Sequence, residues 1–315
     1  MTKSFCLCAA IVTIACSSLL SAASQLDRRL EQIFGPKPQF EAKRFGPAKW
    51  IEDGAAYTLL EVRKEKAQGK DLVRYDTATG RREVLIAAER FTPSGAEAKP
   101  LAIEDYAWSK DGRWLLIFAN AQKVWRQKTR GDYWVLEVAR GGLRRLGGKA
   151  PAASLMFAKF SPDGTRAAYV HEHNLYVEDV RSGAIRQVTK DGGKTVINGM
   201  GDWVNEEELD IRDGYRWSDD SRSLAYWQFD LSGVGEFTLL DTTRGPYPVL
   251  KQFAYPKVGT RNSAVRIGVV AASGGRTRWV QLPGDPREHY VARLEWAKGA
   301  GQLVVHQLNR LQNTL

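Results

Sequence analysis

The sequence predicts an all-β protein, a partial β-propeller of about four to five blades that follows a short N-terminal arm. Three observations predict this fold. From Lys49 onward, Val, Tyr, Trp, Leu and Ile fall in short runs that Gly, Asp, Asn and Pro separate. One phrase recurs along the chain, and hairpin patterns stand between its copies. Repetition of such a unit, with about four strands in each copy, is typical of propeller blades.

The repeated phrase consists of an aromatic residue, a serine, a turn on Asp-Gly or Asp-Ser, and an apolar run. Three close copies begin at Ala107, Lys159 and Arg216, and two weaker copies begin at Trp50 and Trp296. The successive aromatic residues are 58, 52, 57 and 79 residues apart. The last interval is therefore predicted to contain an insertion or a further blade.

Each part of the phrase has a physical role in a blade. The aromatic residue is expected to enter the core between blades, and the turn needs residues that tolerate a left-handed backbone. The apolar run is expected to form an inner strand that is buried on both faces. Between copies, one hairpin is predicted from Asn174 to Val188 with its turn at Ser182-Gly183, and another from Leu72 to Ile86 with its turn at Thr79-Gly80.

Composition indicates a globular protein without a nucleic-acid partner. The 315 residues are 43% hydrophobic and 26% charged, with a mean hydropathy of -0.38, which fits neither a disordered chain nor a membrane-embedded bundle. The net charge is +10. Basic residues mix with acidic ones along most of the chain, as in Arg63-Lys64-Glu65-Lys66, and this mixing indicates a solvated surface rather than a nucleic-acid-binding face.

Residues 1–23 are predicted to be a cleaved export signal. Lys3 precedes an uncharged run, and Ser21-Ala22-Ala23 supplies the small residues of a cleavage site. An uncleaved N-terminal membrane anchor is the alternative. All three cysteines lie in this segment, at Cys6, Cys8 and Cys16. The mature chain is therefore expected in the periplasm or outside the cell, without disulfides or thiolate metal sites.

The rest of the chain divides into two predicted parts. Residues 24–48 form the arm, in which Leu26, Leu30 and Ile33 have near-helical spacing up to a stop at Gly35-Pro36. Residues 49–315 form the propeller.

The segment GDWVNEEELD, residues 201–210, is the sharpest candidate for a functional site. Three consecutive carboxylates repel one another, which costs little in a solvated loop or an exposed helical turn. The functional alternative is that Trp203 and Val204 anchor the segment by their apolar side chains while adjacent carboxylates point into a cavity and receive a cation. Spacing alone leaves both readings open.

Several segments together resemble a known family. They are DWVNEEE, DGYRWSDDSRSLAYWQFD, YPKVGTRNSAVRIGVV and KVWRQKTRGDYWV. In sequence and order they closely resemble the N-terminal propeller of the dipeptidyl peptidase IV family of serine exopeptidases, in its exported bacterial branch. The resemblance extends from about Trp50 to the end of the chain. It implies an eight-bladed propeller that caps an α/β-hydrolase domain, of which about four to five blades are present here.

The resemblance also implies a function for three residues. The last two glutamates of the family motif DWVYEEE bind the free α-amino group of a peptide, and they correspond to Glu207 and Glu208. A family arginine that holds a backbone carbonyl or carboxylate of the substrate corresponds to Arg126. Asn205 replaces the tyrosine of the motif and leaves the glutamates in register. The implied role is to admit and bind peptide N-termini for removal of X-Pro or X-Ala dipeptides.

The catalytic machinery implied by the family is not found in these residues. No G-x-S-x-G motif occurs in the sequence, so no residue is assigned a catalytic role. A truncated reading frame or a partial sequence that ends within the propeller is the expected explanation. The implied partners are a peptide with a free N-terminus, the α/β-hydrolase domain of the complete chain, and a second copy in a homodimer. No cofactor and no metal is expected.

Other motifs are weaker. His171 and His173 are expected at a hairpin turn rather than on a metal, and Ser273-Gly274-Gly275 lacks the lysine of a phosphate-binding loop. Two rival functions remain: a free-standing periplasmic binding propeller of the translocation-protein-B type, and a scaffold without a ligand. The combination of Arg126, Glu207 and Glu208 favours the peptidase hypothesis, because neither rival function requires these three residues.

We predict that this chain does not hydrolyse Gly-Pro or Ala-Pro amides, because it contains no recognisable activated serine. The measurement is release of a chromogenic amine by the purified chain. Turnover that copurifies with the chain and is abolished by a serine-directed inhibitor would contradict the prediction.

Overall fold

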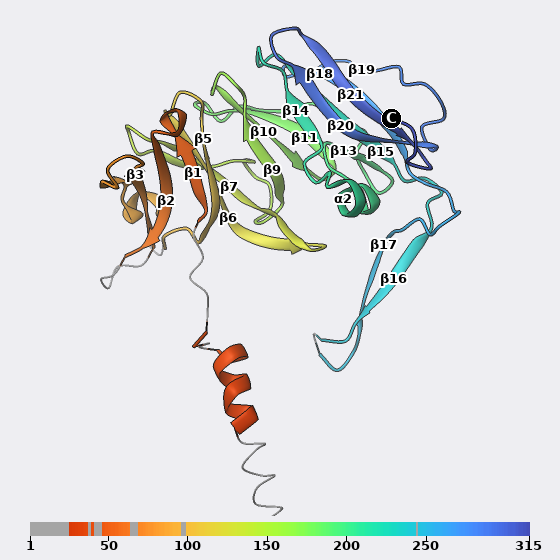
Figure 1. Cartoon of the computed structure of the whole chain (residues 1–315). Helices are drawn as coiled ribbons and strands as arrows, with labels where there is room; N and C mark the ends of the chain where they lie inside the picture. The colour runs from red at the N-terminus through yellow and green to blue at the C-terminus, as the bar shows by residue number, and fades with distance from the viewer. Residues whose placement is uncertain (1–24, 37–38, 41–45, 64–68, 96–98, 244) are drawn as a thin grey trace, which may run out of the picture. The chain divides into compact units, whose positions relative to one another are not determined.

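The computed structural model describes residues 25–36, 39–40, 46–63, 69–95, 99–243 and 245–315 (Figure 1). The predicted signal, residues 1–23, lies outside the described residues. The chain separates into two compact units, Met1–Gly46 and Pro47–Leu315. In the first unit, residues 25–34 are helical, as the spacing of the leucines predicts, and the Gly35 amide donates to the Glu31 carbonyl where the helix ends. Among the described residues, no helix has the length and apolar character required to cross a membrane.

The second unit begins with a four-stranded antiparallel sheet, in the order β1-β2-β3-β4. Its strands are β1 (Ala48–Ile51), β2 (Ala56–Val62), β3 (Lys70–Asp76) and β4 (Arg82–Ile86), with short 3-10 helices at Glu52–Gly54 and Ala88–Phe91. The hairpin predicted between Leu72 and Ile86 is confirmed as β3 and β4.

The middle sheet has eight strands and contains two blades. The first comprises β5 (Ile103–Trp108), β6 (Trp114–Val124), β7 (Gln127–Glu137) and β8 (Leu143–Arg145), and the second comprises β9 (Leu155–Phe160), β10 (Arg166–His171), β11 (Asn174–Asp179) and β12 (Ile185–Gln187). A short β7–β9 pairing, Arg130 with Met156 and Gly131 with Leu155, joins the two blades. The predicted hairpin from Asn174 is confirmed as β11 and β12.

A third sheet and two separate hairpins complete the described fold. The sheet contains β13 (Val196–Asn198), β14 (Tyr215–Trp217), β15 (Ser223–Asp230), β18 (Ala264–Ala271) and β19 (Arg278–Trp279), and the hairpins are β16 (Glu236–Asp241) with β17 (Val249–Ala254), and β20 (His289–Ala297) with β21 (Gln302–Asn309). Since β15 pairs directly with β18, the β16–β17 hairpin is the insertion that the long last interval predicted. Within the described residues the sheets do not close into a ring, which agrees with a partial propeller (Figure 1).

The serine of the repeated phrase organises the same turn in all three close copies. The Ser161 hydroxyl donates to Asp163 Oδ1 over 2.6 Å and accepts from the Arg166 amide at 3.1 Å. Ser109 with Asp111 and Ser218 with Asp220 repeat this arrangement. The third turn residue has a positive φ, 69° at Gly112, 70° at Gly164 and 62° at Ser221. The serine hydroxyls also hold the pKa values of the Asp111 and Asp220 carboxyls below their usual range.

Alternate residues of each inner strand enter different cores. In β6, Leu115 and Ile117 pack toward the first sheet, whereas Leu116 and Phe118 pack toward the next blade. The apolar segments of β10 and β15 show the same alternation. The expectation of inner strands buried on both faces is therefore confirmed for the three close copies, and the blades of β6, β10 and β15 need a neighbour on either side. It is wrong for the two weak copies, because one face of β2 and both faces of β21 are partly exposed.

Three tryptophans of the repeated phrase form hydrogen bonds to the preceding blade, whereas Trp50 does not pack against a neighbouring blade. The indole nitrogens of Trp108, Trp217 and Trp296 donate to Thr58, Lys159 and Arg216 of the preceding blade at 3.2, 3.4 and 3.2 Å. The expectation for the weak copy at Trp50 is wrong, because that side chain is 71% exposed. Trp50 pairs in register with Tyr57, on the face of β2 opposite to its fully buried residues Ala56 and Thr58.

We predict that Ser161→Ala lowers the free energy of unfolding by roughly 1–3 kcal/mol, because it leaves the partly buried backbone amide of Arg166 without its hydrogen-bond partner. Ser161 is 2% exposed. Ser182→Ala, in an exposed turn where the hydroxyl also binds an aspartate, is the control and should cost less than about 1 kcal/mol. Urea unfolding of both variants checks this. Equal losses would show that the buried turn has no special importance.

Candidate functional site

Helix α2 (Trp203–Leu209) carries the acidic motif and lies between β13 and β14. Asp202 caps it: the Asp202 Oδ1 atom accepts from the Asn205 amide at 2.9 Å and from Asn205 Nδ2 at 2.7 Å. The other carboxylate oxygen accepts from the Ser263 hydroxyl beside β18. Asn205, which stands where the family motif has tyrosine, thus helps to fix the start of the helix.

The chain entering α2 lies directly against the chain leaving it. At the C-terminal end, Asp210 adopts a left-handed conformation with φ 59°, and the Ile211 amide donates to the Asn205 carbonyl at 3.0 Å. A Cβ atom on Gly201 would meet the Ile211 carbonyl oxygen at 1.8 Å. Only glycine permits this approach, which holds the short helix in one orientation.

The buried side of α2 differs from the expectation. In the functional alternative Trp203 and Val204 anchor the segment, but both are half-buried and line a cleft, whereas Asn205 and Glu206 are buried. The periodicity of a helical turn places Glu206 on the inner side together with Asp202.

Glu206 is therefore a buried carboxyl group, 6% exposed. Burial raises its pKa to about 7, against the opposing charge of Arg212 and with a further increase from Glu207 and Asp210. Arg212 Nε is 3.9 Å from Glu206 Oε1, too far for a hydrogen bond, and Arg212 Nη2 instead pairs with Asp210 at 2.8 Å.

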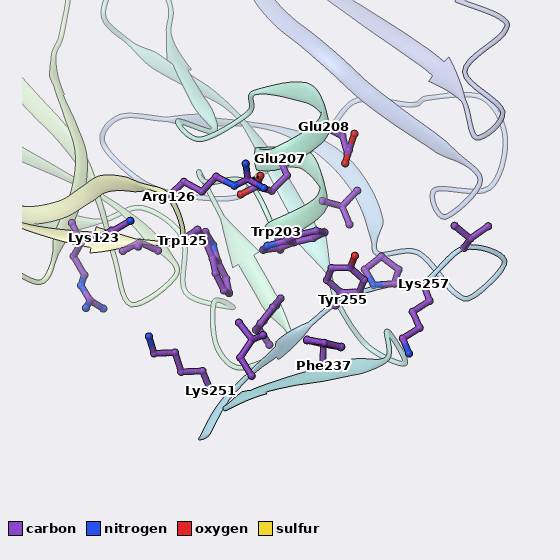
Figure 2. Close-up of a pocket in the computed structure, with 17 residues that line it drawn as sticks. Lys123, Trp125, Arg126, Trp203, Glu207, Glu208, Phe237, Lys251, Tyr255 and Lys257 are labelled. Atoms are coloured by element: carbon purple, nitrogen blue, oxygen red, sulfur yellow. Dashed lines mark ion pairs between the residues drawn. The ribbon is translucent and has the colours of Figure 1, made fainter. Parts of the chain in front are cut away.

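Glu207 pairs with Arg126, which comes from a distant part of the chain. Arg126 Nε lies 2.8 Å from Glu207 Oε2, and the side chains are 78% and 12% exposed, respectively. Arg126 stands at the tip of the β6–β7 hairpin, where Trp125 has a positive φ of 49°. Figure 2 shows Arg126 extended toward Glu207. The structure thus brings Arg126 together with one of the two predicted glutamates.

Glu208 is exposed and lines the same cleft as Glu207 and Arg126. The cleft has a volume of about 1280 Å³, and segments of β6–β7, α2 and β16–β17 form its walls (Figure 2). All three site residues predicted from the sequence therefore border one cavity. Nothing in this geometry by itself assigns a ligand to them.

An aromatic wall lines this cleft, and the sequence interpretation missed it. It consists of Trp125, Trp203, Phe237, Phe253 and Tyr255. The Trp203 ring lies 4.3 Å from that of Tyr255, and the Trp125 ring lies edge-on to Phe253 at 4.6 Å. The repeated phrase accounts only for aromatic residues in the cores between blades. Phe237, Phe253 and Tyr255 lie in the 79-residue interval and outside the repeated phrase, and this position was the signal that could have revealed part of the wall.

The histidines lie in the predicted hairpin turn. Glu172 and His173 occupy it with φ values of 46° and 60°, between the last residue of β10 and the first of β11. His173 Nδ1 is 2.6 Å from the Gly193 carbonyl oxygen. In the described part of the chain, no three potential metal-ligating side chains form a group.

The fold and the site define a class of protein, a β-propeller portion in which two adjacent glutamates, Glu207 and Glu208, border one cleft together with Arg126. The chain belongs to the family of the dipeptidyl peptidase IV N-terminal region, whose model matches residues 109–315. The resemblance of the motifs to this family is thereby confirmed.

Known proteins with similar sequences are dipeptidyl aminopeptidases. The chain is 28% identical over 280 residues to a probable dipeptidyl-aminopeptidase B of Podospora anserina, covering 84% of this chain and 30% of that protein. It is 29% identical over 239 residues to dipeptidyl aminopeptidase B of Saccharomyces cerevisiae, covering 74% and 28%. The chain thus spans about a third of the length of the curated relatives that it matches.

A solved structure is also similar. The crystal structure of Porphyromonas gingivalis dipeptidyl peptidase 4 superimposes with a TM-score of 0.75 at 31% identity, covering 87% of this chain and 38% of that one. This similarity supports the assignment of the sheets to a propeller.

We predict that Glu206→Gln stabilises the chain at pH 8 by roughly 1–3 kcal/mol, since a tenfold change in proton affinity corresponds to about 1.4 kcal/mol. The folded-state pKa of about 7 exceeds the unfolded value of 4.5. Below the unfolded pKa, Glu206 is protonated in both states and its burial does not lower the free energy of unfolding. As the pH rises from the unfolded pKa toward the folded pKa, the carboxyl group ionises only in the unfolded chain, and the free energy of unfolding falls.

The measurement is urea unfolding at pH 5 and pH 8. Between these pH values the free energy of unfolding should fall less in Glu206→Gln than in the wild type. In Glu208→Gln, on the exposed side of the helix, it should fall as much as in the wild type. If the two variants show the same pH dependence as the wild type, Glu206 is not the group responsible.

Proposed function

We propose that this chain is the substrate-selecting propeller portion of a serine exopeptidase that removes X-Pro or X-Ala dipeptides from peptide N-termini. One observation supports this most directly: Glu207 and Glu208, adjacent on α2, border the same cleft as Arg126. Membership of the family and the names of its relatives support the same proposal.

The proposed ligand of the two carboxylates is the α-ammonium group of a peptide. An ammonium group donates three hydrogen bonds, and two carboxylates on neighbouring positions of one helix can accept them together. The Glu207 side chain is only 12% exposed. Water therefore screens its attraction to a cation less than it screens an ion pair on the protein surface. A peptide with a blocked N-terminus has no charge to offer and would leave the carboxylates unpaired.

Arg126 is proposed to orient the peptide backbone beyond the ammonium group. Its Nε atom binds Glu207, and its side chain is 78% exposed toward solvent. The terminal guanidinium nitrogens can therefore donate to a peptide carbonyl while Nε holds the carboxylate. The ion pair fixes the arginine relative to the ammonium site, which restricts the direction in which the peptide leaves it.

The aromatic wall gives the first side chains of the peptide an apolar surface. Trp125, Trp203 and Tyr255 are partly accessible in the cleft, and rings of this kind pack well against small side chains and proline. Fixing the N-terminus at a set distance from a catalytic serine would decide which bond is cut. That serine would belong to the α/β-hydrolase domain of the complete protein, in the periplasm or outside the cell.

The test is binding of short peptides to the full chain. Trp125 and Trp203 lie in the cleft and report occupancy by their fluorescence. Ala-Pro-Ala amide with a free N-terminus should bind, and its N-acetylated form should bind at least tenfold more weakly. Glu207→Gln should weaken binding of the free-amine peptide roughly tenfold to a hundredfold, since a hydrogen bond to a charged group contributes about 1.5–3 kcal/mol.

Glu83→Gln, an exposed glutamate on β4 outside the cleft, is the matched control and should bind as the wild type does. Equal affinity for free and acetylated peptides would overturn the proposal. So would Glu207→Gln and Glu208→Gln variants that both bind as the wild type does.

A further inference from the structure

The cleft carries more positive than negative side chains. Glu207 and Glu208 are its only acidic lining residues among those described. Five cations line the same cavity: Lys123, Arg126, Arg130, Lys251 and Lys257. Since Arg126 already pairs with Glu207, the remaining cations exceed what the carboxylates on α2 can neutralise.

Lys123 and Arg130 stand on the two strands of the β6–β7 hairpin, and Lys251 stands on β17. The β6–β7 hairpin belongs to the middle sheet, and the β16–β17 hairpin is inserted between β15 and β18 of the third sheet. The two hairpins are far apart in the sequence, yet both border one cavity. In Figure 2, Lys123 and Lys251 lie on one side of the Trp203 ring and Glu208 lies on the other. The cleft therefore has an acidic end at α2 and a cationic end at the two hairpins, where Lys123, Arg130 and Lys251 lie, whereas Lys257 follows β17 and lies near Tyr255 (Figure 2).

The cations at this end have little compensation from the protein. Within the part of the chain that the structure describes, Lys123 and Arg130 form no ion pair, and the Arg130 side chain donates one hydrogen bond, to Gln122 Oε1 at 3.3 Å. Lys251 pairs with Asp241 at 3.3 Å but remains 50% exposed. Like charges that converge on one cavity repel one another, and an anion between them relieves that repulsion.

We infer that the cationic end binds a carboxylate carried by the same peptide whose N-terminus lies at α2, so that the cleft prefers acidic peptides. This inference rests on the proposed function. The carboxylate can belong to an Asp or Glu side chain beyond the first dipeptide or to the C-terminus of a short peptide. Both have the same charge and the same two acceptor oxygens.

The experiment compares four peptides on the full chain by calorimetry. They are Ala-Pro-Gln-Gln amide, Ala-Pro-Glu-Glu amide, Ala-Pro-Gln-Gln free acid and N-acetylated Ala-Pro-Glu-Glu amide. Against the neutral amide, the Glu-Glu amide should bind about threefold to tenfold more tightly at low salt, as expected for a few exposed ion pairs. A gain for the free acid alone assigns the site to the C-terminal carboxylate.

The gain should disappear in the Lys123→Gln, Lys251→Gln double variant, while affinity for the neutral amide stays unchanged. Both lysines are exposed, so the variant should fold. Lys110→Gln, in the exposed β5–β6 turn, is the control and should keep the gain. Raising the salt concentration from about 20 mM to about 500 mM should reduce the gain, because the ion pairs are screened.

The outcomes separate the two proposals. If the neutral free-amine amide binds and neither carboxylate-bearing peptide binds more tightly, the inference is overturned and the proposed function stands. If the acetylated Glu-Glu peptide binds as tightly as the free-amine form, the cationic end is supported and the ammonium site is overturned. Absence of binding by all free-amine peptides overturns both.

Discussion

Burial of the inner strands β6, β10 and β15 on both faces is the constraint on which the rest of this structure depends. Alternate residues of β6, β10 and β15 enter two different cores, so that no sheet is complete without its neighbours. The tryptophan indoles that donate to the preceding blade add directional contacts to this apolar packing. The serine turns keep each inner strand in register with the strand before it, and register decides which residues enter which core.

This constraint also determines where functional groups can lie. Charged side chains cannot occupy the inner strands without losing solvation, so they collect where the chain leaves a blade. Arg126 is at a hairpin tip, the glutamates are on a helix between two strands, and Lys251 is on an inserted hairpin. A cleft bordered by such segments can change its charge and shape while the blades stay the same.

The parts that the sequence predicted are those with local determinants. The serine turn needs residues that stand a few positions apart, and all of them are visible in the phrase. The exposure of Trp50 could not be predicted from the phrase. It depends on which face of β2 is occupied by Tyr57, the residue that pairs with Trp50. The aromatic wall depends on where the β16–β17 hairpin packs, and the Arg126–Glu207 pair depends on the approach of two distant segments.

The three consecutive glutamates of α2 show how one helical turn separates identical side chains chemically. A helix places successive residues about 100° apart around its axis, so the three carboxyl groups face the core, a neighbouring hairpin and solvent. Burial favours the neutral form of Glu206, Arg126 compensates the charge of Glu207, and water solvates Glu208. Repulsion within the run is thereby reduced, because Glu206, the most buried of the three carboxyl groups, has its pKa raised to about 7. The run of acids, for which the sequence suggested a solvated loop or an exposed helical turn, lies in a helix that buries one of its carboxyl groups and leaves two at the cleft.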